Sequence, residues 1–246
     1  MPDKDCAEAV LSVFDRIYVL NLPHRRDRRR EMEAELARIG LSFAHPSVTL
    51  FPAIAPADPG EFPSLGARGC FESHLAMHRA ILASGARRAL ILEDDASFAR
   101  GFAERFADAL PVLRGPDWDL LYSVQPVTAQ PGDRSLGHGL LRLSPEHSFL
   151  TTHFLGVSRA FSEAASSYLD KMRTRRAGDP YGGPMHVDGA YVWMRKDLPD
   201  LGILATELPL ATQRSSRSDI AGQRLHHRLP LLRDAVAMLR RLGRRA

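Results

Sequence analysis

The stretch that decides the fold is Ala89-Leu-Ile-Leu92, which is followed at once by Glu93-Asp94-Asp95. Four consecutive apolar residues are typical of a strand buried on both faces, as in a parallel sheet covered by helices. Ligands of open α/β sheets bind beyond the carboxyl ends of the strands. Three adjacent acids at such an end repel one another, and Mg²⁺ or Mn²⁺ would relieve that repulsion. The alternative is a solvated acidic loop in which Asp94 or Asp95 caps the next helix.

Strands and helices alternate on both sides of this stretch. Apolar runs rich in β-branched and aromatic residues predict strands at residues 17–22, 48–54, 89–92, 119–123, 140–143 and 149–157. Apolar residues at helical spacing predict helices at residues 25–39, 69–85, 98–113, 159–172 and 187–194. Residues 125–139 are rich in Pro, Gly and polar residues and are expected to form a mobile loop. The alternation predicts an α/β fold with a largely parallel sheet.

The composition is that of a soluble globular protein. With 246 residues, 44% of them hydrophobic and 25% charged, intrinsic disorder and a collagen-like repeat are excluded. The two cysteines, Cys6 and Cys70, show no finger spacing, which argues against a disulfide framework or a structural zinc and fits a reducing compartment. No signal-peptide pattern and no run of about 18 apolar residues is found, so a cytoplasmic protein is expected.

The charge balance is modestly basic. Lys and Arg number 33 against 29 Asp and Glu, which gives a net charge of +4 and fits an anionic ligand such as a phosphate or a membrane surface. Nucleic-acid-binding proteins normally carry a denser basic stripe with interleaved aromatic residues, so no nucleic-acid partner is expected. We expect an N-terminal tail over residues 1–15, one domain over residues 16–228 and a basic amphipathic helix over residues 229–246.

A second candidate site follows the first predicted strand. Asn21 ends that strand, and Arg25 and Arg28 stand near the start of the next helix. Guanidinium groups beside a helix N-terminus suit a phosphate or an anionic nucleotide. The alternative is a solvated helix face on which Asp27 and Glu31 pair with neighbouring arginines.

A third candidate is a pair of histidines. His74 and His78 are one helical turn apart and could share a metal ion. The pattern differs from that of zinc proteases, because Leu75 stands where the catalytic Glu would follow the first His. The alternative places His74 in a helix packing surface, hydrogen-bonded there, and leaves His78 exposed.

These motifs occur in a characteristic order. They are Asn21-Leu22 with Arg25, Asp27 and Arg28; Gly69-Cys70 with Ser73-His74; and Ile91-Leu92-Glu93-Asp94-Asp95. In this order and at these separations they resemble glycosyltransferase family 25, which includes bacterial lipopolysaccharide and lipooligosaccharide galactosyltransferases and collagen galactosyltransferases. Later segments, at residues 152–158, 187–188, 209–213 and 218–220, extend the resemblance over residues 16–222.

The resemblance implies a GT-A fold, a Rossmann-like α/β glycosyltransferase domain with a mostly parallel central sheet. It implies that Asp94 and Asp95 hold Mn²⁺ or Mg²⁺, which neutralises charge on the departing nucleoside diphosphate. The residues expected around the UDP-sugar donor are Asn21, Leu22, Arg25, Arg28, Ser73, His74, Glu93, Asp94, Gln213 and Arg214, with Arg217 nearby.

An inverting transfer also needs a general base, and Asp188 is the candidate. The alternative for Asp188 is simple N-capping of a helix over residues 189–194. His186 or His226 is a further candidate metal ligand or base, and spacing does not choose between them.

The expected function is therefore a metal-dependent transfer of a hexose, with UDP-galactose as leading donor, to a glycan hydroxyl such as that of lipopolysaccharide or lipooligosaccharide. The C-terminal helix would contact the inner face of a bacterial cytoplasmic membrane, where a lipid-linked acceptor is found. Its alternative is ordinary packing with a basic tail in water. The alternative functions are a metal-dependent phosphodiester-cleaving enzyme and a non-catalytic carbohydrate- or nucleic-acid-binding protein.

Overall fold

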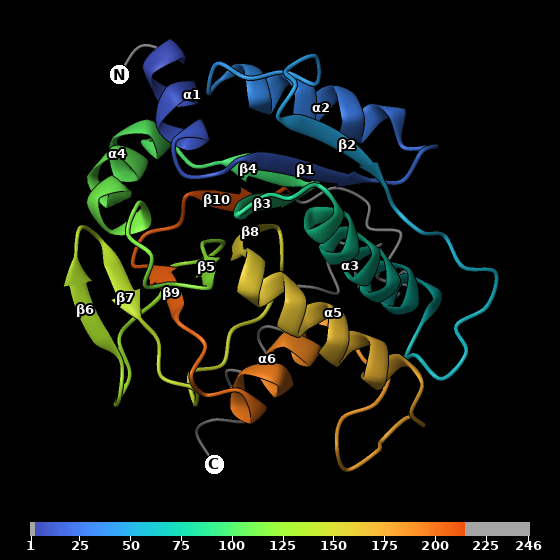
Figure 1. Cartoon of the computed structure of the whole chain (residues 1–246). Helices are drawn as coiled ribbons and strands as arrows, with labels where there is room; N and C mark the ends of the chain where they lie inside the picture. Colours follow the sequence, from blue (N-terminus) through green and yellow to red (C-terminus); the bar gives the residue numbers. More distant parts are fainter. Residues whose placement is uncertain (1–2, 215–246) are drawn as a thin grey trace, which may run out of the picture. The chain divides into compact units, whose positions relative to one another are not determined.

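An eight-stranded sheet runs through the computed structural model, which describes residues 3–214 (Figure 1). Its strands are β1 (Arg16–Asn21), β2 (Val48–Pro52), β3 (Arg88–Glu93), β5 (Leu120–Tyr122), β6 (Arg134–Gly137), β7 (Leu140–Arg142), β8 (Phe154–Ser158) and β9 (Ile203–Thr206). A separate pair is formed by β4 (Ala96–Phe98) and β10 (Ala211–Gln213). The described residues fall within one compact unit, Met1–Ser215.

The strand order is β2-β1-β3-β8-β5-β9-β7-β6. Parallel pairing joins β1 to β2 and β3, and β5 to β9. Strands β8 and β7 are antiparallel to their neighbours, so the other six strands of the sheet share one direction. The predicted α/β class with a mostly parallel sheet is confirmed.

Helices cover both faces of this sheet. They are α1 (Asp3–Leu11), α2 (Arg26–Ala37), α3 (Leu65–Ala83), α4 (Phe102–Leu113), α5 (Arg159–Arg173) and α6 (Val187–Asp197). Helices α3, α5 and α6 contact one another on one side of the sheet, and α1 and α4 contact each other on the other side (Figure 1). Serine hydroxyls begin two of these helices, because Ser64 and Ser158 accept hydrogen bonds from Ala67 N and Phe161 N.

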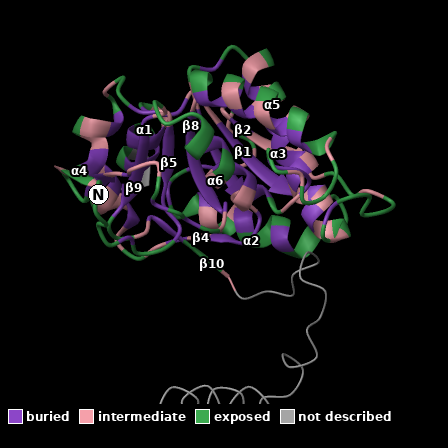
Figure 2. Cartoon of the chain, turned by 90° about the horizontal axis from the view of Figure 1, so that it is seen from below, coloured by how far each residue is buried: buried purple, intermediate pink, exposed green. Residues whose placement is uncertain are grey.

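The hydrophobic core is built on the central strands of the sheet. Residues 89–92 of β3 have no exposed surface, because β1 and β8 flank the strand and helices cover its faces. Figure 2 shows that buried residues are concentrated in the middle of the domain and exposed residues on the outer helices and loops. Gly156 of β8 lets the core close tightly, since a Cβ there would lie 2.9 Å from Cε1 of Phe14. The apolar stretch that predicted the fold is thus the centre of the core.

The first fifteen residues differ from the predicted tail. They contain α1, and Cys6, Val10 and Phe14 are buried in the main core. Apolar side chains at intervals of four residues give this short segment one face that packs against the domain. This helix is not apparent from the sequence, because charged residues are interleaved with its few apolar ones.

Four short strands were not predicted. Strand β6 lies within the expected mobile loop, β4 occupies the expected start of a helix that begins at Phe102, and β9 and β10 follow α6. Each has only three or four residues, too few for a clear periodic signal. The segment predicted as a strand from residue 149 enters the sheet only at Phe154.

The expected C-terminal helix, residues 229–246, lies outside the described residues. Within the described part of the chain, no helix is both long enough and apolar enough to cross a membrane.

Candidate functional site

The acidic motif lies where β1 and β3 end. Asn21 is the last residue of β1 and Glu93 the last of β3, and the two strands are parallel neighbours. Because β8 runs antiparallel to β3, the residues that precede β8 reach the same edge. Glu93 N donates a hydrogen bond to His153 O at 3.1 Å, which places the His153 side chain beside the acids.

Glu93, Asp95 and His153 form a compact group of potential ligands. His153 Nδ1 is 3.4 Å from Glu93 Oε2 and 3.2 Å from Asp95 Oδ1. Asp95 and His153 are buried, and Asp95 Oδ1 and both ring nitrogens of His153 make no hydrogen bond among residues 3–214. Burial opposes charge on the ring, but the two carboxylates outweigh it and raise the pKa of His153 to about 10. The pKa of Glu93 is lowered because His153 and His74 outweigh its burial.

Asp94 faces a different set of partners. Its Oδ1 accepts from Arg28 NH1 at 2.7 Å, and its Oδ2 accepts from Asn21 Nδ2 at 2.7 Å. Burial raises the pKa of Asp94 against the opposing effect of Arg28. Arg28 NH1 also lies 3.8 Å from Asp95 Oδ2. Arg28 thus supplies positive charge to the motif from α2, and the predicted role of Asp94 as a metal ligand stays a prediction.

The acidic turn is held from the C-terminal side by the end of β10. Gln213 Nε2 donates to Asp95 Oδ2 at 3.2 Å, and Arg214 N donates to Asp95 O at 2.8 Å. The Arg214 guanidinium donates to Ala96 O and Asp94 O, each at 2.6 Å. Two residues predicted from the resemblance therefore do meet the acidic motif, although more than a hundred residues separate them from it.

Helix α3 brings His74 toward Glu93. His74 Nε2 lies 3.7 Å from Glu93 Oε1, and both His74 and His78 are fully buried. The expectation that His78 is exposed is wrong, because α5 and α6 cover this part of α3. Ser73 Oγ donates to Gly69 O and accepts from Ile54 N, so its contacts hold the chain that follows β2.

Asp188 stands in the first turn of α6. Its Oδ2 accepts from Thr151 N at 3.1 Å and its Oδ1 from Gly189 N at 2.8 Å. The residue that caps α6 is His186, so the N-cap alternative for Asp188 is wrong. Thr151 has a positive φ of 80°, and the contact with Asp188 fixes the chain two residues before His153.

Comparison with known protein families gives a match for the N-terminal part of the chain. Residues 14–114 match the model described as "Glycosyltransferase family 25 (LPS biosynthesis protein)". This region belongs to glycosyltransferase family 25. It contains α2, α3 and the whole acidic motif, whereas His153, Asp188 and Gln213 lie beyond it.

The curated relatives include proteins with different activities in their names. "Inactive glycosyltransferase 25 family member 3" of Homo sapiens and "Procollagen galactosyltransferase 1-B" of Xenopus laevis are each 28% identical over 127 residues, covering 44% of this chain and 21% of the relative. "Glycosyltransferase 25 family member" of Aedes aegypti is 31% identical over 128 residues, covering 43% and 20%. The chain thus spans about a fifth of the length of these relatives.

A solved structure supports the fold. A glycosyltransferase involved in the glycosylation of the major capsid of PBCV-1 aligns over 82% of this chain and 94% of its own, with a TM-score of 0.50 and 11% identity. The family 25 region is thus part of a GT-A-like fold, as the sequence predicted.

Other predicted donor residues are placed less centrally. Arg25 pairs with Asp27 at 2.7 Å, as the helix-face alternative proposed, and Leu22 is partly buried beside it. His186 is exposed, and Arg217 and His226 lie outside the described residues.

Thr152 and His153 were not predicted as site residues. Residues 152–158 extended the family resemblance and lay mostly in a predicted strand, but neither signal gave these two residues a role. A strand that runs antiparallel in a mostly parallel sheet is not apparent from a local pattern. Thr152 Oγ1 donates to Glu93 Oε1, so both residues contact the acid.

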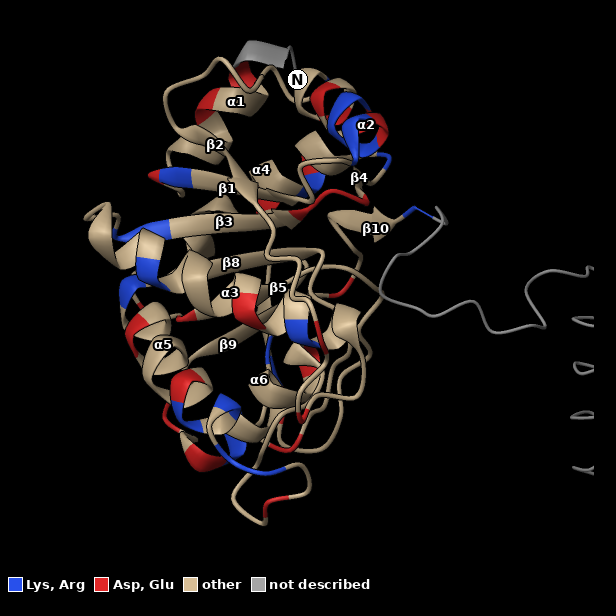
Figure 3. Ribbon diagram, turned by 90° about the vertical axis from the view of Figure 1, so that its right-hand side faces the viewer, with Lys and Arg blue, Asp and Glu red and all other residues tan. Residues whose placement is uncertain are grey.

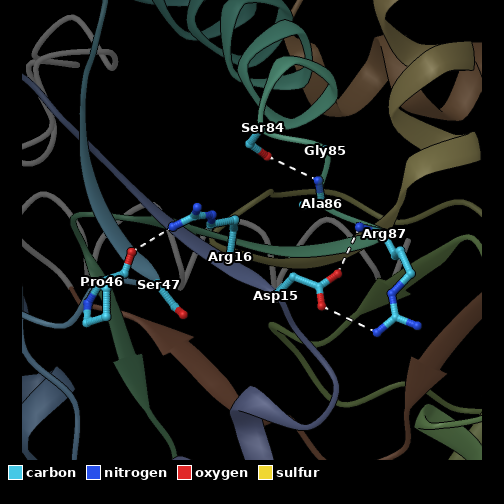
Figure 4. Close-up of a pocket in the computed structure, with 8 residues that line it drawn as sticks. All are labelled: Asp15, Arg16, Pro46, Ser47, Ser84, Gly85, Ala86 and Arg87. Atoms are coloured by element: carbon cyan, nitrogen blue, oxygen red, sulfur yellow. Dashed lines mark hydrogen bonds and ion pairs between the residues drawn. The ribbon is translucent and has the colours of Figure 1, made fainter.

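A separate hollow lies at the opposite edge of the sheet, where β1 and β3 begin (Figure 4). It measures about 550 Å³ and is lined by Asp15, Arg16, Pro46, Ser47, Ser84, Gly85, Ala86 and Arg87. None of the predicted site residues lines it. Its charged groups are already paired, because Arg87 lies 3.6 Å from Asp15 and Arg16 donates to Pro46 O.

Proposed function

We propose that this family 25 protein transfers a hexose, galactose from UDP-galactose, to a glycan hydroxyl with inversion. The observation that carries the proposal is the group of Glu93, Asp95 and His153 at the carboxyl edge of a GT-A-like sheet, with buried atoms that make no hydrogen bond within the described part of the chain. Arg28 and Arg214 lie beside this group, and their guanidinium groups would supply positive charge to an anionic diphosphate.

The residues present suit a divalent cation. One atom from each of Glu93, Asp95 and His153 lies within 4.8 Å of the other two, and two carboxylates with an imidazole form a donor set suited to Mn²⁺. We propose these three residues as its ligands, with Asp94 held beside them by Arg28. When bound, the ion would offset negative charge on the departing nucleoside diphosphate.

Asp188 is the proposed general base. Its carboxylate is partly exposed, and the two backbone amides that it accepts leave further lone pairs for a hydroxyl proton. An ionised carboxylate is the form of the side chain that accepts a proton from a hydroxyl.

The proposed acceptor is a lipopolysaccharide or lipooligosaccharide glycan, lipid-linked at the inner face of a bacterial cytoplasmic membrane. The family description names lipopolysaccharide biosynthesis, and the basic C-terminal segment with its many arginines favours an anionic surface. Vesicle sedimentation of the full chain, with and without residues 229–246, tests this placement.

Turnover tests the proposed chemistry. The full chain is incubated with UDP-galactose, Mn²⁺ and a lipooligosaccharide acceptor, and the released UDP is measured. Asp188→Asn should lower kcat by about 10²- to 10⁴-fold, because an amide group cannot accept the hydroxyl proton. Donor binding is measured beside it, because the substitution also weakens the contact with Thr151 N.

The matched control is Asp197→Asn, an exposed acid at the far end of the same helix. It should leave kcat unchanged. Equal kcat for Asp188→Asn and the parent protein would remove Asp188 from the mechanism.

A further inference from the structure

A second group of potential ligands lies beside the acidic motif. One atom each from Cys70, His74 and Glu93 lies within 4.8 Å of the other two. Cys70 and His74 are one turn apart on α3, so both side chains face the end of β3. Cys70 and Glu93 are partly exposed, which gives an ion access to the group.

The ring of His74 is held by a hydrogen bond at Nδ1, the nitrogen that faces away from Glu93. Its Nδ1 lies 2.9 Å from the hydroxyl of Tyr191, which lies 2.8 Å from Nε2 of His78. Burial lowers the pKa of His78 to about 3, so the ring is neutral and one of its nitrogens accepts a hydrogen bond. When Tyr191 donates to His78 Nε2, it accepts from Nδ1–H of His74, and His78 Nδ1–H donates to Ser162 Oγ.

A metal ion would select this order of protons, because it leaves the lone pair of His74 on Nε2, facing Glu93. That atom is fully buried and has no hydrogen-bond partner among the described residues. It lies 3.7 Å from Glu93 Oε1, too far for a normal hydrogen bond. A lone pair that faces a carboxylate and a cysteine sulfur is stabilised by a cation placed between them.

We propose that Cys70, His74 and Glu93 form a second metal site, for an ion of the zinc class. A thiolate and an imidazole select Zn²⁺ over Mg²⁺ or Mn²⁺, and three protein ligands leave one position open to water. A hydrogen bond from the other ring nitrogen to a fixed acceptor, here the Tyr191 hydroxyl, is the usual support of a ligating histidine. On binding, the Cys70 thiol releases its proton to solvent and the sulfur bonds to the ion.

Glu93 connects this site to the group assigned above to the proposed function. Its Oε1 faces His74, whereas its Oε2 lies 3.4 Å from His153. Each oxygen therefore serves a different set of ligands. The second site needs neither Asp95 nor His153, so it can be tested separately from the transferase proposal.

The test is titration of the full, metal-free chain with Co²⁺ alone, followed by absorption, and with Zn²⁺ alone, followed by competition with a chromophoric chelator. Co²⁺ at a zinc site bonded to a thiolate gives a charge-transfer band in the near ultraviolet. We expect this band to reach its maximum at one equivalent. Cys70→Ser should abolish it and weaken Zn²⁺ binding by at least about tenfold.

The matched control is Cys6→Ser, which removes the other cysteine of the chain and should retain the band and the affinity. Asp95→Asn should retain the band as well, even if it abolishes nucleotide-sugar binding. The proposal is overturned if the parent protein shows no thiolate band, or if the band survives Cys70→Ser. Near-ultraviolet circular dichroism of each variant confirms that the fold is intact.

Discussion

Glu93, Asp94 and Asp95 are consecutive, yet each carboxylate has different partners. Asp94 is bound by Arg28 and Asn21, whereas Glu93 and Asp95 face His153. The sequence predicted where these acids lie, because a strand followed by acids is a local pattern. The division of roles was not predictable, since it depends on partners brought in by α2 and by the segment before β8.

The charge of His153 predicts how stability depends on pH. In metal-free protein its pKa is raised to about 10, above the unfolded value of roughly 6.5. A raised pKa means that its stabilising effect is full below about pH 6.5 and is lost as pH rises through about 10. Urea unfolding in EDTA should show that the parent protein loses more stability between pH 6.5 and 10 than His153→Gln does.

The comparison variant is His45→Gln, since His45 lies outside the acidic group and contacts Ser47 N. It should follow the parent protein over this range. Identical pH profiles for His153→Gln and the parent would show that His153 is not charged by Glu93 and Asp95.

At the scale of elements, helices α3, α5 and α6 share a buried polar link. His78, Ser162 and Tyr191 come from the three helices in turn, and all are fully buried. The spacing of His74 and His78 was visible in the sequence. Their burial was not, because it depends on α5 and α6 packing over α3 more than eighty residues later.

Tyr191→Phe tests this link. Loss of the hydroxyl leaves nitrogens of His74 and His78 without a partner, and each unsatisfied buried group costs about 1–3 kcal/mol. We expect the free energy of unfolding, measured in urea, to fall by about that amount or more. Tyr168→Phe, which loses a contact between α5 and Asp197 near the surface, should have a smaller effect. An equal effect of the two variants would contradict the account.

Strands β4 and β10 show another limit of sequence reasoning. They pair with each other across more than a hundred residues, through Ala96 with Gln213 and Phe98 with Ala211. This pairing places Gln213 and Arg214 against the acidic turn. Neither three-residue strand has a local signal, and only the resemblance drew attention to these two residues.

At the scale of the molecule, the candidate site residues lie at one edge of the sheet, where β1 and β3 end. Helix α2 carries basic and acidic residues side by side, and it brings Arg28 to the acidic end of β3 (Figure 3). Residues 16–98 supply the acids and their arginine, whereas residues beyond 150 supply His153, Asp188 and Gln213. The completed site therefore depends on the whole fold. A fragment limited to residues 14–114, the part that matches family 25, would lack His153, Asp188 and Gln213.

The N-terminal segment is part of that fold. Phe14 is fully buried, with its ring centroid 6.3 Å from that of Phe106 and 6.4 Å from that of Trp118. Phe14→Ala should lower the free energy of unfolding by about 3–5 kcal/mol, through lost burial and a new cavity. Thermal and urea unfolding measure this change. The control is Leu65→Ala, at a half-exposed position, which should change the free energy of unfolding by about 0.5 kcal/mol or less. A similarly small change for Phe14→Ala would mean that the N-terminal segment does not pack against the domain.

The central claim is that the edge formed by β1, β3 and the segment before β8 binds a nucleotide sugar with a divalent cation. Calorimetric titration of the full chain with UDP-galactose, in Mn²⁺ and then in EDTA, tests it most directly, with Asp95→Asn as the variant and exposed Asp170→Asn as its control. We predict binding that requires Mn²⁺, survives Asp170→Asn and weakens at least about tenfold in Asp95→Asn. Absence of binding by UDP-galactose and other nucleotide sugars in Mn²⁺, or equal affinity of Asp95→Asn, would contradict the claim.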